Sequence, residues 1–334
     1  MTHDKRDSLS VFWGKDIVGT LRRLPVPGRL SFLYDRGWLQ SGGPGISLSL
    51  PLSEAEQDPE TSSNFFSNLL PEGMAYVVFT LMKHIPQGDT FTFLARYGRE
   101  CAGALCILPQ GKTPDDSPVD YRDITSDLES LLALSAKTRV NLMAATNAKV
   151  SLAGAQDKLP VLYDSGRFLV PAESSPAATT HIIKAPTGAL PDVQYNESAC
   201  LALAKAIGLP VPNARIINIG GVDVLLVERY DRTAVGGSVY RIHQEDFCQA
   251  AGVSSQLKYQ ENGGPGFARC ADVARGLTDT AEAIDDLARI AIFNLIIGNC
   301  GAHAKNLSLL YDHLPELDHR GPGMRMAPFY DLLC

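Results

Sequence analysis

Residues 295–309 read Leu-Ile-Ile-Gly-Asn-Cys-Gly-Ala-His-Ala-Lys-Asn-Leu-Ser-Leu. The apolar run that enters this stretch, Ile290 to Ile297, is predicted to be the end of a buried helix, and the run after Asn306 has the composition of a strand. Between the two runs lie nine small or polar residues, Gly298 to Asn306. A polar segment between two core elements is well placed to hold a charged ligand rigidly. This stretch is therefore the first candidate for a functional site.

A second segment further along the chain complements the first. Residues 326–333 read Met-Ala-Pro-Phe-Tyr-Asp-Leu-Leu, so that Asp331 directly follows a Pro-aromatic-aromatic piece with strand character. An amide such as that of Asn306, followed later in the chain by an aspartate, is the pair with which kinases hold Mg²⁺ on a nucleotide. The two segments together indicate a magnesium–nucleotide site.

The two segments resemble the catalytic and metal-binding loops of the HipA family, serine/threonine kinases that are the toxins of bacterial toxin–antitoxin pairs. Other matches extend the resemblance over nearly the whole chain. In protein kinases the catalytic base, an aspartate, lies five residues before the magnesium-binding asparagine. Counting back five residues from Asn306 gives Gly301. The position of the family's base therefore carries no side chain.

A small-residue turn upstream is the candidate phosphate loop. Residues 151–158 read Ser-Leu-Ala-Gly-Ala-Gln-Asp-Lys and precede a strand, which lets backbone N–H groups approach phosphate oxygens. A plain hairpin with glycine at its tip has the same composition, and the chain contains no G-x-x-x-x-G-K-[ST] motif. The segment closely matches the nucleotide loop of the family, in which the serine at the position of Ser151 is autophosphorylated and switches the kinase off. The resemblance implies nucleotide contacts by Ala153, Gly154, Ala155, Gln156, Asp157 and Lys158.

Lys184 ends a short apolar strand that begins at His181. A strand lysine that points inward can pair with the α- and β-phosphates, whereas a solvated lysine at a strand end is the alternative. The small-residue loop upstream, in kinase order, favours the phosphate role. Glu197 could be the acidic partner of Lys184, although a glutamate near a helix start also complements the helix dipole.

Residues 224–227 are predicted to form a strand that runs into the charged segment 228–232. This phrase resembles the hinge between the two lobes in the family, so the resemblance implies adenine contacts around Glu228, Arg229 and Tyr230. A strand exit with local ion pairs would have the same sequence, and the two interpretations are compatible.

Phosphoryl transfer requires a phosphate loop, a phosphate lysine, two magnesium ligands and a base. The resemblance implies ATP and Mg²⁺ as cofactors, with Lys184, Asn306, Asp331 and the position of Gly301 as the catalytic set. The same loop contributes His303, Ala304 and Lys305, which are expected to contact phosphate or to shape the loop. A general base contributes about 10²–10⁴-fold to rate. The chain is therefore expected to be a weak kinase or, alternatively, an inactive pseudokinase that binds nucleotide or an antitoxin.

The length of 334 residues and the 45% hydrophobic content predict two domains and a large core. We expect an α+β fold, with a β-rich N-terminal module (1–110), a kinase-like N-lobe with the nucleotide loop (111–230) and a kinase-like C-lobe (231–334). The sequence stops three residues after Asp331. We therefore expect an incomplete helical C-lobe, a truncation relative to the family, and an exposed apolar face on the helix predicted at 280–297.

Charge and composition indicate the partners. A net charge of −7 without any Lys/Arg-rich run argues against a general nucleic-acid-binding surface. The polar N-terminus has no secretory signal and no apolar run is long enough to span a bilayer, so we expect a cytoplasmic protein without a membrane partner. Seven scattered cysteines are expected to be free, buried thiols. The resemblance implies a DNA-binding antitoxin of the HipB type, contact with DNA only through it, and a protein substrate such as an aminoacyl-tRNA synthetase.

The remaining periodicities predict individual elements. Period-two alternation over residues 8–50 predicts antiparallel strands with one solvated face, and the Phe65–Phe66 pair is expected to pack a helix on that sheet. Further predictions are strands within 89–108, a loop at 109–118, a strand at 159–163, helices at 199–207 and 280–297, and a helix start at 241–247.

Overall fold

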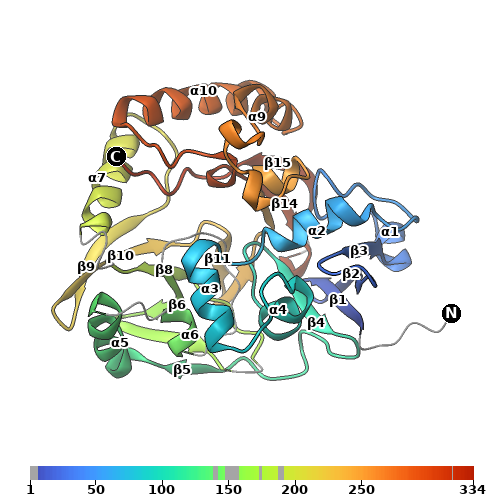
Figure 1. The fold of residues 1–334 in the computed structure, drawn as a ribbon, viewed down its shortest axis with the longest axis horizontal. Coiled ribbons are helices and arrows are strands. Elements are labelled where there is room, and N and C mark those ends of the chain that lie inside the picture. Colours follow the sequence, from blue (N-terminus) through green and yellow to red (C-terminus); the bar gives the residue numbers. More distant parts are fainter. Residues whose placement is uncertain (1–6, 138–141, 147–157, 173–174, 187–191, 318) are drawn as a thin grey trace.

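The computed structural model describes residues 7–137, 142–146, 158–172, 175–186, 192–317 and 319–334 (Figure 1). The fold is a mixed α+β arrangement, as expected. It begins with a four-stranded antiparallel sheet in the order β3-β2-β1-β4. Its strands are β1 (Ser8–Trp13), β2 (Asp16–Arg23), β3 (Leu30–Tyr34) and β4 (Leu105–Pro109).

Strand β1, one of the two central strands of this sheet, is buried on both faces, which differs from the expected solvated face. Every residue of β1 is buried. The ring of Trp13 lies 5.9 Å from that of Trp38 and 4.4 Å from that of His243, so a later part of the chain packs on the face that carries Trp13. On the opposite face, Phe12 forms a separate small cluster with Cys106 and Leu108. The predicted strand at 46–50 is also absent: a single bridge joins Ser47 and Leu50.

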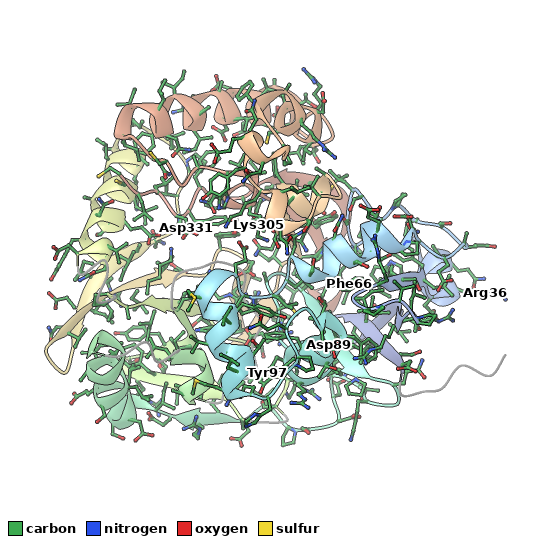
Figure 2. The ribbon with its side chains drawn as sticks, viewed as in Figure 1. Arg36, Phe66, Asp89, Tyr97, Lys305 and Asp331 are labelled. Carbon is green, nitrogen blue, oxygen red and sulfur yellow. The ribbon has the colours of Figure 1, made fainter. Side chains whose placement is uncertain are left out.

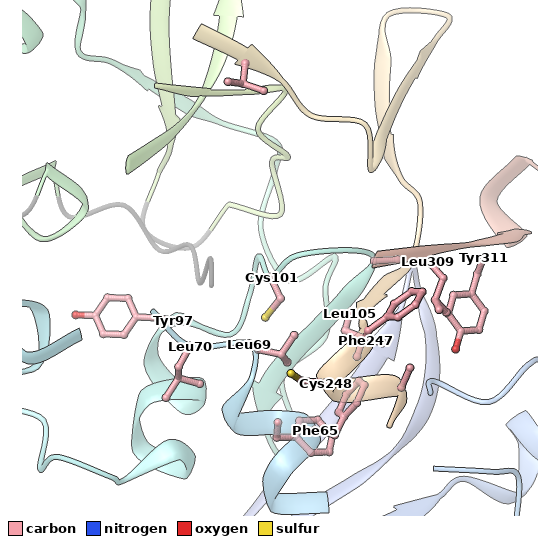
Figure 3. Close-up of a cluster of buried hydrophobic side chains, with 14 of the residues drawn as sticks. Phe65, Leu69, Leu70, Tyr97, Cys101, Leu105, Phe247, Cys248, Leu309 and Tyr311 are labelled. Carbon is pink, nitrogen blue, oxygen red and sulfur yellow. The ribbon is translucent and has the colours of Figure 1, made fainter. Parts of the chain in front are cut away.

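Four helices lie between β3 and β4 in the chain, and three of them contact the N-terminal sheet. They are α1 (Arg36–Ser41), α2 (Pro59–Ser67), α3 (Gly73–Met82) and α4 (Thr90–Tyr97). Phe65 and Phe66 of α2 are fully buried, with Phe66 5.6 Å from Phe32 of β3, which confirms the predicted helix-on-sheet contact. Figure 3 shows that Phe65 and Leu105 share a core with Phe247 and Leu309 of the C-terminal part. The strand predicted at the start of 89–108 is wrong, because α4 occupies that position.

The middle of the chain builds a six-stranded sheet in the order β5-β7-β6-β8-β10-β9. Its strands are β5 (Tyr121–Asp123), β6 (Lys158–Asp164), β7 (Arg167–Pro171), β8 (His181–Lys184), β9 (Ala214–Ile219) and β10 (Val222–Glu228). The helices of this part are α5 (Thr125–Lys137), α6 (Leu142–Thr146) and α7 (Val193–Ala206). Helix α7 begins six residues before the predicted start at position 199, so Glu197 lies inside the helix.

The last part combines a hairpin, a three-stranded sheet and helices. The strands are β11 (Arg232–Val235), β12 (Ser238–Arg241), β13 (Gln244–Asp246), β14 (Ser308–Leu314) and β15 (His319–Met326). The α-helices are α8 (Phe247–Ala250), α9 (Phe267–Ala274) and α10 (Thr280–Ile297), with 3₁₀ turns at Ser255–Leu257, Gln260–Asn262, Ala304–Asn306 and Pro315–Leu317. The helix start predicted at 241–247 is therefore displaced to Phe247 by strand β13.

Helix α10 has the predicted bounds because both of its ends are capped. The side chain of Asp279 accepts a hydrogen bond from the Glu282 N–H, and Gly298 ends the helix at a φ of 71°. Its outer face is apolar and exposed, as expected: Leu295 is 82% and Ile296 75% solvent-accessible. No helix in the described part of the chain is long and apolar enough to cross a bilayer. All seven cysteines are free, five of them buried and two, Cys300 and Cys334, exposed.

Candidate functional site

The site is organised around Lys184, at the end of β8 in the middle of the six-stranded sheet. The Nζ of Lys184 donates to Oε1 of Glu197 on α7 at 2.5 Å and also forms an ion pair with Asp331. Burial disfavours the ammonium, but the carboxylates of Asp331 and Glu197 outweigh it and raise the pKa of Lys184 above its usual value. The structure thus brings together the predicted lysine, its expected glutamate partner and the predicted metal-binding aspartate.

Two lysines control the charge of Asp331. Burial disfavours its carboxylate, but Lys184 and then Lys158 lower the pKa of Asp331 to about 2. Burial also lowers the pKa of Lys158, which lies opposite Lys184 in the register of strands β6 and β8. Oε2 of Glu197 is buried and has no hydrogen-bond partner in the described part of the chain. At neutral pH the site therefore offers an ionised carboxylate beside two lysines.

The backbone of Asp331 is strained. Its φ is 54°, a left-handed conformation that non-glycine residues seldom adopt and that is frequent at functional sites. The preceding residues hold this conformation: the N–H of Phe329 donates to the Pro210 carbonyl at 2.8 Å, and the ring of Phe329 is buried. The aspartate is thus presented from a fixed segment.

The loop after α10 is closed by its own amides. Asn299 donates to the side-chain oxygen of Asn294 at 3.0 Å and to the Asp331 carbonyl at 3.5 Å. Oδ1 of Asn299 accepts from the Gly301 N–H at 3.0 Å, and the Asn306 amide donates to the Gly301 carbonyl at 3.1 Å. Asn299, Asn306 and Asp331 line one cavity of about 430 Å³. The two predicted metal ligands therefore face a common space.

The other predicted residues of this loop point in different directions. His303 lines the same cavity with its ring edge-on to Tyr259 at 4.8 Å, and burial lowers the pKa of His303 to about 4. Ala304 is buried and lines the cavity as well. Lys305 is buried, and Figure 2 shows it in the same part of the molecule as Asp331. Its ammonium is bonded to Asn68 and Asp246, so it already has protein partners. Of these residues, His303 is the one with a titratable group at the cavity.

The predicted hinge is occupied by internal contacts. The N–H of Glu228 donates to the Asn213 carbonyl and that of Arg229 to the Thr180 carbonyl. The ring of Tyr230 stacks on that of Tyr330, 5.7 Å away, which connects the hinge to the residue before Asp331.

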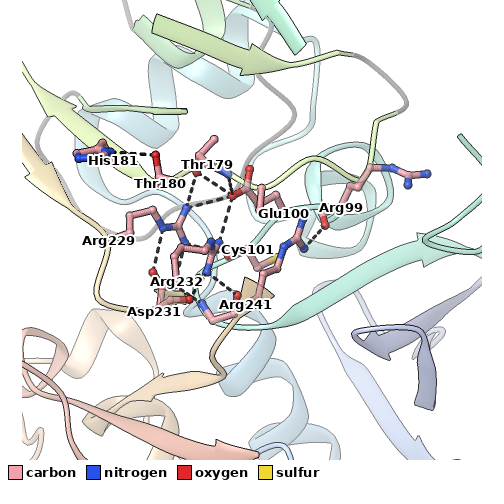
Figure 4. A network of polar contacts seen from close by, with 12 residues as sticks. Arg99, Glu100, Cys101, Thr179, Thr180, His181, Arg229, Asp231, Arg232 and Arg241 are labelled. Atoms are coloured by element: carbon pink, nitrogen blue, oxygen red, sulfur yellow. Dashed lines mark hydrogen bonds and ion pairs between the residues drawn. The ribbon is translucent and has the colours of Figure 1, made fainter. Parts of the chain in front are cut away.

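The side chain of Arg229 enters a buried ionic network (Figure 4). It bonds the carboxylates of Asp231 and Glu100, and Arg232 contacts the same two acids. Glu100 also accepts hydrogen bonds from the N–H and hydroxyl of Thr179. The adenine contacts predicted around residues 228–230 stay a prediction.

The predicted phosphate loop lies outside the described residues, apart from Lys158 at its end. This holds for Ser151, Ala153, Gly154, Ala155, Gln156 and Asp157. Asn299, which joins the loop to the Asp331 segment, was missed by sequence reasoning, although an asparagine directly after a helix-ending glycine was a usable signal. The contacts of Lys305 with Asn68, at 2.8 Å, and with Glu72, at 3.5 Å, were also missed. The distance of both residues from the loop in sequence leaves no local signal.

Two family models match the chain. The HipA-like C-terminal domain matches residues 150–334, and the HipA N-terminal domain matches residues 9–108. The chain belongs to the HipA family. The expected family and its kinase-like fold are thereby confirmed.

Relatives of the chain agree with this assignment. "Putative kinase Y4mE" of Sinorhizobium fredii is 38% identical, over 97% of this chain and 76% of that protein. "Serine/threonine-protein kinase toxin HipA" of Shewanella oneidensis is 30% identical, over 100% of this chain and 76% of that protein. A solved Shewanella oneidensis complex of HipA, HipB and operator DNA contains a chain similar to this one, with a TM-score of 0.80 and 29% identity, covering 97% of this chain and 76% of that chain.

Proposed function

We propose that this HipA-family chain binds ATP with Mg²⁺ and transfers phosphate to a serine of a protein, at a rate limited by the missing side chain at Gly301. The observation that supports this most directly is the convergence of Lys184, Glu197 and Asp331 from a strand, a helix and the C-terminal segment. A lysine–glutamate ion pair beside a metal-binding aspartate is the arrangement that kinases require.

The residues present fit a magnesium nucleotide. Mg²⁺ at nucleotide sites takes one or two protein oxygens and completes its shell with phosphate and water. Asn306 and Asp331 supply such oxygens at one cavity, and the low pKa of Asp331 keeps its carboxylate ionised. Lys184 is charged and buried, so it can pair with phosphate where it now pairs with Asp331. When bound, the metal would neutralise charge that develops on the phosphoryl group.

The acceptor base is the part that the chain lacks. Gly301 offers backbone alone, and its N–H and carbonyl are bonded to Asn299 and Asn306. His303 faces the cavity and stays neutral at pH 7 because burial lowers its pKa to about 4. A base that weak removes a hydroxyl proton poorly, since catalysis favours a pKa near the working pH. Binding is therefore proposed to be intact and transfer slow.

Calorimetric titration with Mg·ATP tests the proposal. Saturable binding by the chain, lost in both Lys184→Ala and Asp331→Ala, is the expected result. A folded chain that takes up no nucleotide would overturn the proposal. Phosphate incorporation at Ser151, detected by mass spectrometry after incubation with Mg·ATP, would extend it from binding to transfer.

A second candidate function is that of a non-catalytic partner of a DNA-binding antitoxin. Gly301 favours it, together with the likeness to a HipA chain solved with HipB and operator DNA. Antitoxin binding without transfer to Ser151 or to an aminoacyl-tRNA synthetase would support this second function. Transfer to a synthetase in the presence of Mg·ATP would support the first. Both place the chain in the cytoplasm, with DNA reached only through the antitoxin.

A further inference from the structure

Lys305, the neighbour of the proposed metal ligand Asn306, is a buried lysine with a complete set of acceptors. Its Nζ lies 2.6 Å from Oδ2 of Asp246, 2.8 Å from Oδ1 of Asn68 and 3.1 Å from the Asn68 carbonyl. An ammonium has three N–H donors, and these three acceptors use all of them. Oε1 of Glu72 adds a second carboxylate at 3.5 Å.

The acceptors come from parts of the chain remote from the loop. Asn68 ends α2 and Glu72 precedes α3, both in the N-terminal part, whereas Asp246 caps α8. Each acceptor is itself fixed. The Asn68 amide donates to the carbonyls of Asn64 and Val253, and Glu72 forms a second ion pair with Lys258 at 2.7 Å. The lysine is therefore held by a rigid cage.

The backbone of Lys305 connects this cage to both proposed metal ligands. Asn306 is the next residue, and the Lys305 carbonyl accepts a hydrogen bond from the Tyr330 hydroxyl at 2.8 Å. Tyr330 directly precedes Asp331, whose φ of 54° depends on how that segment is held. One residue thus joins the cage, Asn306 and the Asp331 segment.

Stability alone does not account for a charge in this position. Burial disfavours the Lys305 ammonium, and Asp246 and Glu72 have to outweigh it to raise the pKa of Lys305. Well-packed apolar side chains in place of a buried ion pair are often neutral or stabilising. The cage does, however, fix the lysine in one geometry, which is what a metal ligand next to it requires.

We propose that Asn68 and Glu72 are positioning residues for the magnesium–nucleotide site and act on Asn306 and Asp331 through Lys305. The proposal rests on the proposed function. It makes the N-terminal part of the chain a structural component of the metal site, with no contact of its own to nucleotide or metal.

The test compares Asn68→Ala with Asn64→Ala in the full chain. Both asparagines donate to the same loop of the C-terminal part, Asn64 to the Gly252 carbonyl and Asn68 to the Val253 carbonyl, each at 2.9 Å. Asn68 alone of the two also accepts from Lys305. ATP binding is measured by calorimetry in EDTA and at increasing Mg²⁺ concentrations, with thermal unfolding recorded for each variant.

We expect Asn68→Ala to raise the Mg²⁺ concentration for half-maximal strengthening of ATP binding by about tenfold, the lower end of what second-shell changes cost in metal affinity. Its ATP affinity in EDTA should equal that of the unaltered chain, because no phosphate ligand has changed. Asn64→Ala should show unaltered magnesium dependence. Glu72→Gln, whose contact with Lys305 is longer, should shift the magnesium dependence in the same direction by less and serves if Asn68→Ala does not fold.

Three results would overturn the proposal. Unaltered magnesium dependence in both Asn68→Ala and Glu72→Gln, with normal Mg·ATP binding by the unaltered chain, removes the positioning role and leaves the proposed function in place. Equal shifts of the magnesium dependence in Asn68→Ala and Asn64→Ala would mean that losing any contact with the loop at residues 252–253 has this effect, without a specific role for Lys305. Absence of ATP binding by the unaltered chain overturns the proposed function and this inference with it.

Discussion

The buried ionic network beside the predicted hinge allows a quantitative test of the structure. Glu100 and Asp231 face Arg229 and Arg232, and all four side chains are at most 5% exposed (Figure 4). Two carboxylates balance two guanidinium groups. Glu100→Gln keeps an acceptor for Thr179 and removes one negative charge, so that two buried cations share one carboxylate.

The cost follows from this imbalance. Removing one partner of a buried ion pair destabilises a protein by about 3–5 kcal/mol, because a charge is left buried without compensation. Arg232→Met should destabilise the protein by a similar amount, because it leaves two buried carboxylates with one guanidinium group. In Glu100→Gln/Arg232→Met the remaining Arg229 and Asp231 balance again, at a separation of 2.8 Å. The double variant should therefore be more stable than the sum of the single losses predicts, by about 1–3 kcal/mol.

Urea unfolding at pH 7, followed by far-UV circular dichroism, measures the four free energies of the cycle. Arg167→Met, which breaks an exposed ion pair with Asp164, is the control and should change the stability little. Additive losses in the double variant would refute the reasoning, since they would mean that the four charges do not compensate one another.

The acid side of the stability profile provides a second check. The pKa of Glu100 is lowered, because Arg229 and Arg232 outweigh the effect of burial, and the pKa of Asp231 is lowered in the same way. A depressed carboxyl pKa contributes stability that is present above the usual value and is lost as the pH falls through the folded value. The usual value of glutamate is 4.5. Glu100→Gln should therefore lose less stability than the unaltered chain below about pH 4.5.

Three further predictions concern the site and its surroundings. Gly301→Asp should raise phosphate transfer from radiolabelled ATP by about 10²–10⁴-fold, and unchanged transfer would contradict a missing base. The substitution should cost little stability, because the backbone of Gly301 is not left-handed and an added Cβ would meet only Oδ1 of Asn299, at 3.3 Å. Asp331→Asn should abolish the strengthening of ATP binding by Mg²⁺ in calorimetry, whereas persistence of that strengthening would place the metal elsewhere. Burial raises the pKa of Glu245 to about 7, so the folded chain holds its proton longer than the unfolded chain and loses stability as the pH rises from 4.5 to about 7. Glu245→Gln should then be stabilised relative to the unaltered chain at pH 8 by about 2–3 kcal/mol in urea unfolding, and a parallel pH profile would contradict this.

Local signals were sufficient for the elements that carry the site. Helix α10 was predicted with its observed bounds because its periodicity ends at Gly298, which adopts the left-handed conformation that glycine tolerates. Strand β8 was found from a short apolar run ending in Lys184. In both cases the sequence pattern and the tertiary environment favour the same structure.

Helix α4 shows how the same approach fails. Thr90 to Phe93 alternate between polar and aromatic residues, which is the pattern of a half-buried strand. The Asp89 side chain accepts from the Thr92 N–H and caps a helix instead, and Phe91, Leu94 and Tyr97 become buried along it. The helix-capping Asp89, directly before Thr90, was the signal that outweighed the two-residue alternation.

Lys305 marks the limit of prediction from sequence for the site. Its position in the loop suggested either a contact with phosphate or a role in shaping the loop, without indicating which residues it would meet. Its acceptor Asn68 lies 237 residues away in the sequence. Pairings at that separation are set by the packing of the N-terminal helices against the loop, which no local pattern records.

The loop geometry shows how residue 301 can be a glycine while Asn306 keeps its position. Asn299 accepts from the Gly301 N–H, and Asn306 donates to its carbonyl. Both bonds are made by the backbone of residue 301, so they do not depend on which side chain it carries. An aspartate at this position would add a proton acceptor without breaking the bonds that hold Asn306. Under the proposed function, nucleotide binding and phosphate transfer are therefore expected to be separable, so a binding measurement and the Gly301→Asp variant test different parts of it.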